Sequence, residues 1–487
     1  MTRFQIASKR DRARPGRAGR VAVALSATVL LAACSGLLDV KNPNNVVEDA
    51  LGNPAAATSI ANGAGATVTR AYSAILSPYG AVTDELTYVG SRDAYGYADK
   101  GEVSDPFNEF SDAAFPEMNE ARWTTAAAVA RLKGFLDEGT LADKNNLARA
   151  LLYEAIIFTG IGEMFDDFVI DANKTGSYTD PSKPGLPLGE GNMSIVFDSA
   201  VAQTTEGLAV AGLTKDNKIR LLAMRARARH SKAIWGKLNG SGGAPASTPV
   251  ASPLVSDAGA DADAAAALTE MGAAADYKFK LTPFSQTLGF PVVGNDLNNR
   301  LELRAGDFQA GNKPADCTTD SCDSWVDPNG AGNAIDSTTL KDPVTGAIDP
   351  AFRANITECC TKGVQNGQGD LVPMTIISAR EMLLIRAEHA LASGNTAGFT
   401  SFINEVRAFN SLTPYAGTPA PQTMLAYTRF VNLYNQGKRL MDMHRFGIKA
   451  RKWVPESEAY AKACFFPVMN IERSTHPEDF VQPLCRP

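Results

Sequence analysis

The stretch SAREMLLIRAEHALAS at residues 378–393, with the segment that follows it to residue 409, decides the fold of this chain. Its apolar side chains recur at helical spacing over most of the circumference, which predicts a largely buried helix. Gly394 can end that helix in a left-handed conformation, and Asn395 can cap a second helix. The second helix places five large apolar residues on one face, namely Phe399, Phe402, Ile403, Val406 and Phe409. The pattern predicts two antiparallel helices packed as a tetratricopeptide-like hairpin.

The same helical spacing recurs along much of the chain. It predicts further helices at residues 45–76, 115–136, 147–165, 193–208, 218–238, 424–434 and 438–449. No repeat of fixed length connects them, so a regular solenoid is not expected. We therefore expect a mainly α fold in which about four tetratricopeptide-like helical hairpins form a scaffold.

Two segments differ from the helical parts in composition. Residues 171–192 and 306–370 are dense in Gly, Asp, Asn, Pro and Thr, and they show no apolar periodicity. The second segment belongs to a loop-rich insertion that we place at about residues 240–373. Long loops on a rigid scaffold usually carry function, so we expect this insertion to carry a ligand-binding surface.

The N-terminus predicts export. A basic segment, residues 1–20, precedes an apolar run, residues 21–33, that is too short for an ordinary membrane span. The run ends in Leu31-Ala32-Ala33-Cys34, which resembles the lipobox of bacterial lipoproteins, where the cysteine is acylated. We expect a signal peptide at 1–33, lipidation at Cys34 and a single mature domain at 34–487. An ordinary signal peptide or a signal anchor with an incidental cysteine is the alternative.

The charge balance argues against nucleic acid as a partner. The chain has 47 basic and 53 acidic residues, and residues 1–33 hold seven basic residues and one acidic residue, which leaves a mature net charge of −12. One segment, residues 219–236, concentrates basic side chains, namely Arg220, Arg225, Arg227, Arg229 and Lys232. An apolar stripe runs along the same segment, so we expect a solvated basic face that meets nearby acids.

A search for catalytic chemistry finds little. The chain has four histidines and lacks the zinc-protease, serine-hydrolase, phosphate-loop and C-x-x-C motifs. The paired carboxylates Asp84-Glu85 and Asp166-Asp167 are expected to be solvated pairs. The segment from Asp327 to Asn333 lacks the later ligands of a calcium loop and is expected to be a turn. We therefore expect no enzyme activity, no cofactor and no metal site.

Five stretches together resemble one family. They are LDVKNPN at 38–44, LARALLYEAIIFTGIGEMFDD at 147–167, MLLIRAEHALASGN at 382–395, FVNLYNQGKRLMDMHRFG at 430–447 and FFPVMNIERSTHP at 465–477. In this order, and after a lipobox, they resemble the SusD/RagB family of outer-membrane nutrient-uptake lipoproteins. Two positions depart from the family pattern: Gln436-Gly437 stands for Glu-Gly, and Val468-Met469 interrupts a Pro-Ile-Pro-like segment.

The resemblance implies a lipid-anchored outer-membrane protein that faces the cell exterior. Such a protein captures oligosaccharides or peptides and passes them to a TonB-dependent transporter of the SusC type, without catalysis. A helical-repeat envelope lipoprotein that binds a protein partner and no small molecule remains the alternative.

Sugar rings are held by flat aromatic side chains together with planar hydrogen-bonding groups. The segment YGAVTDELTYVGSRDAYGY at residues 79–97 concentrates both kinds. From it we select as candidate ligand-binding residues Tyr88, Arg92, Asp93, Tyr95 and Tyr97. Trp325, flanked by Asp323 and Asp327 in the insertion, is a second candidate platform.

The cysteines are candidates for disulfides, because an exported protein enters an oxidising compartment. After Cys34 is lipidated, six remain: Cys317, Cys322, Cys359, Cys360, Cys464 and Cys485. We expect adjacent Cys359 and Cys360 to need two outside partners, which Cys317 and Cys322 would supply, while Cys464 and Cys485 tie down the C-terminal tail. The alternative is a local Cys317–Cys322 bridge, with Cys359 or Cys360 reaching the tail and one or two thiols left free.

Overall fold

The computed structural model describes residues 51–170, 187–239, 250–272, 275–283, 292–306, 340–360 and 371–474. The chain divides into two compact units, Met1–Asn53 and Pro54–Pro487, and the helical scaffold and its strands belong to the second unit. The predicted signal peptide and Cys34 lie outside the described residues. The described helices include none whose length and apolar character would let it cross a membrane.

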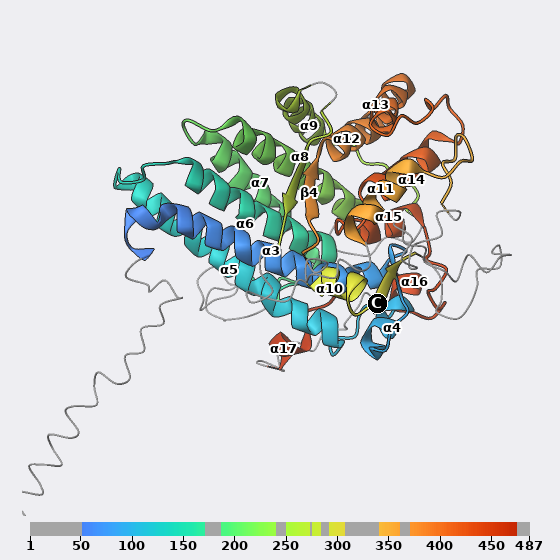
Figure 1. Ribbon diagram of the computed structural model, residues 1–487, viewed down its shortest axis with the longest axis horizontal. Coiled ribbons are helices and arrows are strands. Elements are labelled where there is room, and N and C mark those ends of the chain that lie inside the picture. The colour runs from blue at the N-terminus through green and yellow to red at the C-terminus, as the bar shows by residue number, and fades with distance from the viewer. Residues whose placement is uncertain are drawn as a thin grey trace, which may run out of the picture. The chain divides into compact units, whose positions relative to one another are not determined.

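Helices dominate the second unit (Figure 1). The α-helices are α3 (Ala57–Val82), α4 (Asp93–Asp99), α5 (Glu109–Asp137), α6 (Asn145–Met164), α7 (Ser194–Ala209), α8 (Lys215–Asn239), α9 (Ala258–Met271), α10 (Val292–Asn298), α11 (Pro350–Cys359), α12 (Ala379–Ala392), α13 (Thr396–Ala408), α14 (Pro421–Asn432), α15 (Arg439–Phe446), α16 (Glu458–Lys462) and α17 (Asn470–Arg473). Two short 3₁₀ helices are η1 (Pro54–Ala56) and η2 (Glu190–Asn192).

The few strands form two antiparallel pairs within the part of the chain that the structure describes. β1 (Leu86–Tyr88) pairs with β3 (Leu303–Ala305), so that Leu86 lies opposite Ala305. β2 (Lys278–Leu281) pairs with β4 (Met374–Ser378), with a register shift in the middle of β2. Each pair joins segments that are far apart in the sequence.

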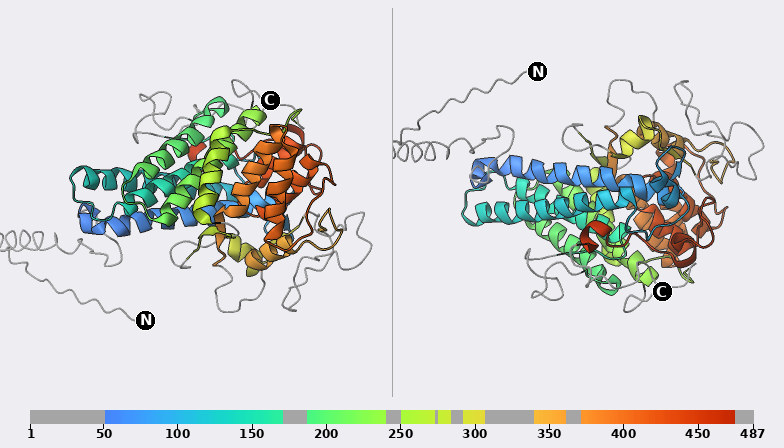
Figure 2. Two further views of the ribbon diagram at one scale, coloured as in Figure 1. Left: turned by 90° about the horizontal axis from the view of Figure 1, so that it is seen from above. Right: turned by 90° about the horizontal axis from the view of Figure 1, so that it is seen from below.

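Consecutive helices pack side by side (Figures 1 and 2). α3 contacts α5 and α6, α6 contacts α7 and α8, and α8 contacts α9. α12 contacts α13, α9 and α14, and α15 contacts both α14 and α8. The contacts of α7 with α8 and of α12 with α13 are those that the predicted hairpins require. The predicted mainly α scaffold of helical hairpins is therefore confirmed.

The α12–α13 hairpin forms as its sequence predicts. The Oγ of Ser378 accepts a hydrogen bond from the amide of Glu381 at 3.1 Å, which caps α12. Gly394 takes a left-handed conformation, with φ of 78°, and the Oδ1 of Asn395 accepts from the amide of Gly398 at 2.9 Å. Phe399 is fully buried against its partner helix. Local capping signals and apolar spacing agree here, so the prediction and the structure coincide.

The insertion that was predicted to be loop-rich contains three helices that the periodicity did not indicate, α9, α10 and α11. α9 is rich in alanine, so its inner face shows little contrast in hydropathy, although Asp257 caps it by accepting from the amide of Ala260 at 2.7 Å. α11 lies inside the segment 306–370 that was predicted as loop. Asp349 caps α11 by accepting from the amide of Ala351 at 2.7 Å, and Pro350 begins it. A capping residue followed by proline was the overlooked signal.

One residue of the expected basic face is in the core. Arg227 is 1% exposed, pairs with the buried carboxylate of Glu163, and donates from Nη1 to the carbonyl of Ile376 at 2.9 Å. The other four basic residues lie nearer the surface and pair with acids, as expected; the pairs are Arg220–Asp216, Arg225–Asp263, Arg229–Asp263 and Lys232–Asp198. Arg227 differs because α6 and β4 cover its side of α8.

A second group of buried charges joins α8, α12, α14 and α15, and we call it the Glu388 network: Glu388, Arg445, Asp442, Arg429 and His230. Both guanidinium nitrogens of Arg445 pair with Glu388, which is fully buried, and Nη2 also donates to Asp442 at 2.7 Å. Burial alone would raise the pKa of Glu388, but the Arg445 guanidinium holds it well below its usual range. Burial lowers the pKa of His230, so its neutral ring contacts Glu388 at 3.0 Å.

Candidate functional site

Most residues of the site proposed from the sequence lie on α4 or next to it, and buried charges hold that helix in place. The carboxylate of Glu302, which directly precedes β3, accepts from the amides of Ser91 and Arg92 at 2.7 and 3.0 Å, at the start of α4. Gly90 lies so close that a Cβ there would overlap Glu302. These contacts attach the start of α4 to a segment about 200 residues later in the chain.

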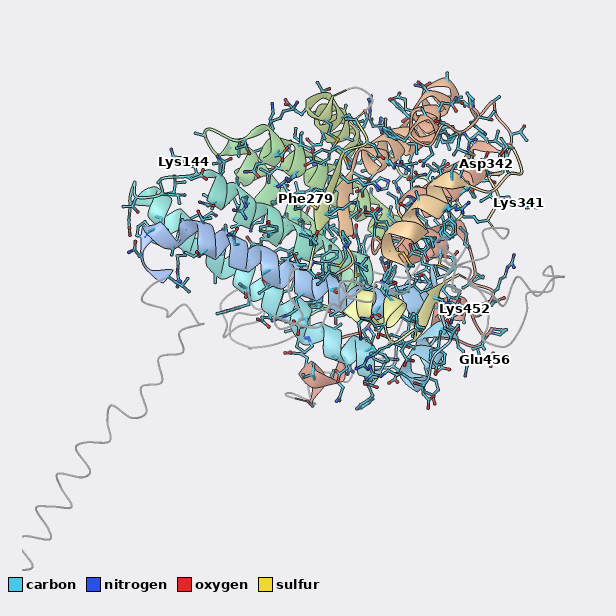
Figure 3. All side chains as sticks on the ribbon, in the orientation of Figure 1. Lys144, Phe279, Lys341, Asp342, Lys452 and Glu456 are labelled. Atoms are coloured by element: carbon cyan, nitrogen blue, oxygen red, sulfur yellow. A yellow bond between two sulfur atoms is a disulfide. The ribbon has the colours of Figure 1, made fainter. Side chains whose placement is uncertain are left out.

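The other end of α4 is held by Lys452, which Figure 3 labels. Its ammonium donates to the carboxylate of Asp99 at 2.9 Å, to the carbonyl of Ala81 at 2.8 Å and to the carbonyl of Leu86. It therefore joins the ends of α3, β1 and α4. Held at both ends, α4 can present fixed side chains to solvent.

Tyr95 is a core residue, so the prediction that it binds ligand is wrong. It is 0% exposed, and its ring stacks on Phe110 at 3.6 Å between centroids. Its hydroxyl donates to the carboxylate of Asp296 and lies 2.9 Å from the Oγ of Ser77. Burial raises the pKa of Tyr95 well above its ordinary value, so the hydroxyl stays protonated.

Tyr97 is on the outer side of the same helix. Residues two positions apart on a helix point in widely different directions, so the burial of Tyr95 leaves Tyr97 outside. Its ring is 47% exposed and lies 5.6 Å from the ammonium of Lys100. Tyr88 is half-buried and packs beside Gly96, where an added Cβ would approach its ring to 3.2 Å. Tyr97 and Tyr88 remain candidates for stacking on a ligand.

The two polar candidates also reach the surface. Arg92 is half-buried, with its guanidinium 4.7 Å from the centre of the Phe110 ring and its Nη2 donating to Glu109 at 2.7 Å. Asp93 is exposed at the first turn of α4. Trp325, the remaining candidate, lies outside the described residues.

Phe107 was not among the candidate ligand-binding residues selected from the sequence, although it is 69% exposed. It lies next to Asn108, whose side-chain amide donates to the carbonyl of Ala94 at 2.8 Å and so attaches this turn to α4. The position between Pro106 and Asn108 was the available signal, because a phenylalanine in a short polar turn has few neighbours to cover it. The structure therefore adds an exposed ring to the α4 region, which we call the α4 surface: Tyr88, Arg92, Asp93, Tyr97 and Phe107.

The paired carboxylates are not solvated pairs, contrary to expectation. Asp84 is buried and accepts two hydrogen bonds from Arg439, at 2.7 and 2.6 Å. Glu85 is 1% exposed, and burial raises its pKa to about 8. Its Oε1 accepts from the amide of Asn435 at 2.7 Å. Asn435 lies in the turn between α14 and α15, and Arg439 is the first residue of α15, so the local sequence around Asp84 cannot reveal these partners.

The second pair of acids also accepts hydrogen bonds from the protein. Asp166 is buried and accepts from the amide of Phe465 at 2.7 Å. Asp167 accepts from the amides of Phe168 and Gly189 at 2.8 Å each, and burial raises its pKa to about 7. All four carboxylates thus accept hydrogen bonds from backbone amides or from an arginine side chain. Within the described ranges, no cluster of three or more histidine, cysteine or acidic side chains is arranged to hold a metal ion.

Cys359 and Cys360 pair differently from the prediction. Cys359 and Cys360 are bonded to each other, so the expectation that each needs an outside partner is wrong. Cys360 follows the last residue of α11, and its backbone has left the helical conformation, with φ of −129° and ψ of 37°. Its side chain therefore need not follow the helical direction and can turn toward Cys359. Cys464 is also disulfide-bonded, and Cys317, Cys322 and Cys485 lie outside the described residues.

No protein-family model matches the chain, and no curated protein matches its sequence. Solved structures resemble it over most of its length. A SusD superfamily protein from Bacteroides thetaiotaomicron is 13% identical, with a TM-score of 0.56, covering 87% of this chain and 98% of that one. A SusD superfamily protein from Bacteroides vulgatus is 12% identical, with a TM-score of 0.54 and coverage of 87% and 97%.

A third solved structure, a putative sugar-binding protein from Bacteroides vulgatus, is 11% identical, with a TM-score of 0.54 and coverage of 87% and 96%. At such identities the likeness concerns the arrangement of the backbone, because few side chains are shared. All three structures align with this chain over most of both backbones. The chain therefore has the SusD-like fold.

Proposed function

We propose that this chain is a cell-surface lipoprotein that captures oligosaccharide or peptide nutrients and delivers them to a TonB-dependent transporter in the outer membrane. The observation that carries the proposal is the match of nearly the whole fold to SusD superfamily structures and to a structure named a putative sugar-binding protein. The α4 surface supports it, because exposed rings beside charged groups suit a polar ring-shaped ligand. In this role the protein binds and releases its ligand without altering it.

A binding screen tests the capture step. The full mature protein, purified in detergent, is screened against oligosaccharides and peptides, and hits are titrated by calorimetry. Tyr97→Ala should weaken a true hit by about 1 to 3 kcal/mol if the ring stacks on ligand. Trp123→Ala is the matched control, since Trp123 is 45% exposed on α5, and it should bind normally. If the protein binds neither the oligosaccharides nor the peptides of the screen, nutrient capture would be contradicted and a protein-binding scaffold would be favoured.

Two further experiments test location and partner. Cys34→Ser should leave the protein as precursor or release it from the membrane fraction, because the acyl chains would be missing. Unchanged membrane partitioning of Cys34→Ser would exclude the lipid anchor. Protease treatment of intact cells should cleave the protein if it faces outward, and a TonB-dependent transporter should co-purify with it from mild detergent.

A further inference from the structure

The Cys359–Cys360 disulfide cannot act as an ordinary structural cross-link. A disulfide stabilises a fold mainly by restricting the unfolded chain, and the effect grows with the number of residues between the cysteines. Here the two cysteines are neighbours that the peptide bond already holds together. The bond therefore connects no separate parts of the protein, and its presence needs a reason other than stability.

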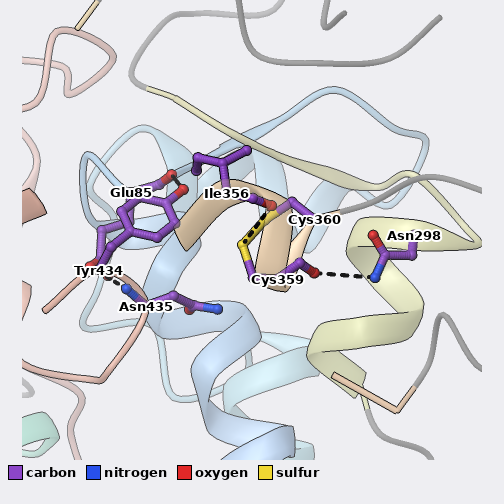
Figure 4. The surroundings of a disulfide bond; sticks show 7 residues. All are labelled: Glu85, Asn298, Ile356, Cys359, Cys360, Tyr434 and Asn435. Carbon is purple, nitrogen blue, oxygen red and sulfur yellow. Dashed lines mark hydrogen bonds between the residues drawn. A yellow bond between two sulfur atoms is a disulfide. The ribbon is translucent and has the colours of Figure 1, made fainter. Parts of the chain in front are cut away.

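The two cysteines, drawn with their hydrogen-bond partners in Figure 4, differ in their exposure to solvent. Cys359 is 7% exposed and packs in the main core, whereas Cys360 is partly exposed past the end of α11. Thiol–disulfide exchange begins by attack on an accessible sulfur. Attack at Cys360 is therefore favoured, with Cys359 as the leaving sulfur.

We propose that Cys359 and Cys360 form a reversible thiol–disulfide redox site that dithiols reduce by two electrons. A thiolate of the dithiol attacks Sγ of Cys360, the S–S bond breaks, and Sγ of Cys359 leaves as a thiolate that takes up a proton. The second thiol of the reductant, after losing its proton, then attacks the mixed disulfide and releases Cys360 as a thiol. The reductant becomes a cyclic disulfide, and the protein gains two hydrogens.

The adjacency of the cysteines also selects the type of reductant. After attack by a monothiol, the neighbouring Cys359 can attack the mixed disulfide at once and expel the monothiol. A dithiol escapes this reversal because its own second thiol closes a ring first. The site should therefore respond to dithiols and resist monothiols at equal thiol concentration.

A change in the redox state of the two cysteines can affect α4 through contacts that α10 makes with both. The side-chain amide of Asn298, the last residue of α10, donates to the carbonyl of Cys359 at 3.2 Å. Two residues earlier on α10, Asp296 accepts from the hydroxyl of Tyr95 on α4. Reduction frees the peptide between the cysteines, so the Asn298 contact should loosen and amide exchange in α10 should rise.

Native-state labelling tests the site. The full mature protein is treated with dithiothreitol without denaturant, alkylated with N-ethylmaleimide and digested with trypsin. The peptide of residues 354–362 should gain two maleimide groups, while the peptide of residues 463–473 stays unlabelled, because Cys464 is 0% exposed and bonded. An equal thiol concentration of glutathione should leave both peptides unlabelled, and removal of dithiothreitol with a mild disulfide oxidant should restore the bond.

A second arm separates redox chemistry from unfolding. The double variant Cys359→Ser, Cys360→Ser should keep its helical circular dichroism and melt within about 3 °C of the wild type. Labelling of residues 354–362 that occurs only together with labelling of Cys464 and loss of helicity would overturn the proposal. So would resistance to dithiothreitol in the folded state, or a double variant that fails to fold.

Discussion

The Glu388 network and the α4 surface both bring together residues distant in sequence, but they differ in what covers them. In the Glu388 network, charges are enclosed on every side, and the side chains of Glu388 and Arg445 are both 0% exposed. On α4, only the inner side is covered, so Tyr95 is buried while Tyr97 is 47% exposed. The same residue types therefore serve the fold in one place and remain available to a ligand in the other.

The degree to which neighbours cover a charged or aromatic side chain decides how much it depends on them. A fully enclosed charge must have its partner, because losing the partner leaves an unpaired charge in a medium of low polarity. An exposed ring loses little when its neighbours change, because water already covers part of it. Enclosure on all sides, more than residue type, decides whether a substitution acts on stability or on binding.

The largest expected effect is the loss of a buried partner. Arg445→Ala removes the guanidinium that pairs with both oxygens of Glu388 and with Oδ1 of Asp442, and we expect the free energy of unfolding to fall by about 3 to 5 kcal/mol. Urea unfolding followed by circular dichroism measures it. Lys133→Ala is the matched control, because its pair with Glu206 is exposed on both sides, and it should cost less than about 1 kcal/mol. Equal losses for the two variants would show that burial is not the deciding factor.

A contrast within one helix sharpens the comparison. Tyr95→Ala removes a stacked, buried ring and should destabilise the protein by roughly 3 kcal/mol, because the space left behind closes only in part. Tyr97→Ala should change stability by less than about 0.5 kcal/mol. Thermal melting of both variants under identical conditions gives the difference. If Tyr97→Ala proves as damaging as Tyr95→Ala, its ring belongs to the fold and the α4 surface loses its main platform.

The third expected effect, about 1 kcal/mol over one pH unit, concerns the pH dependence of a buried acid. Burial raises the pKa of Glu85 to about 8, so the folded protein keeps this carboxyl protonated while the unfolded chain ionises it above its ordinary pKa of 4.5. The stability contributed by the protonated group is complete below that ordinary value and is lost as pH rises toward about 8.

The variant Glu85→Gln isolates this effect, because glutamine stays neutral and can still accept from the amide of Asn435. Relative to wild type it should gain about 1 kcal/mol between pH 6 and pH 7, with no further gain above about pH 8. Urea unfolding at several pH values measures the difference and removes contributions from other titrating groups. A constant difference across the range would mean that Glu85 is already ionised in the folded protein.

The local sequence was sufficient for the helical scaffold. Helical spacing and capping groups act within a few residues, so Ser378, Gly394 and Asn395 mark the ends of α12 and α13 in the sequence as they do in the structure. The SusD-like fold was inferred from a resemblance, and three of the five stretches that carry it, at residues 147–167, 382–395 and 430–447, lie largely on scaffold helices. α9 escaped notice because alanine on every face gives no contrast between inside and outside.

The candidate site followed from the sequence only in part. The segment that contains Tyr88 and Tyr97 was identified from its composition, but composition does not say which rings face outward. Tyr95 fell on the inner side of α4 because Phe110 and Asp296 cover it. Phe107 was left exposed because nothing in its turn folds over it.

The sequence by itself determined most helices of the scaffold and where several of them begin and end, because those signals are local. Only the tertiary structure decided which polar residues are enclosed, because their partners are remote. Asp84 and Arg439 are separated by 355 positions, and Arg227 reaches a carbonyl 149 positions away. Even for the neighbours Cys359 and Cys360, the choice of partner depended on where α11 ends and on what covers each sulfur. No spacing rule encodes such coverage, since it arises only when separate helices pack together.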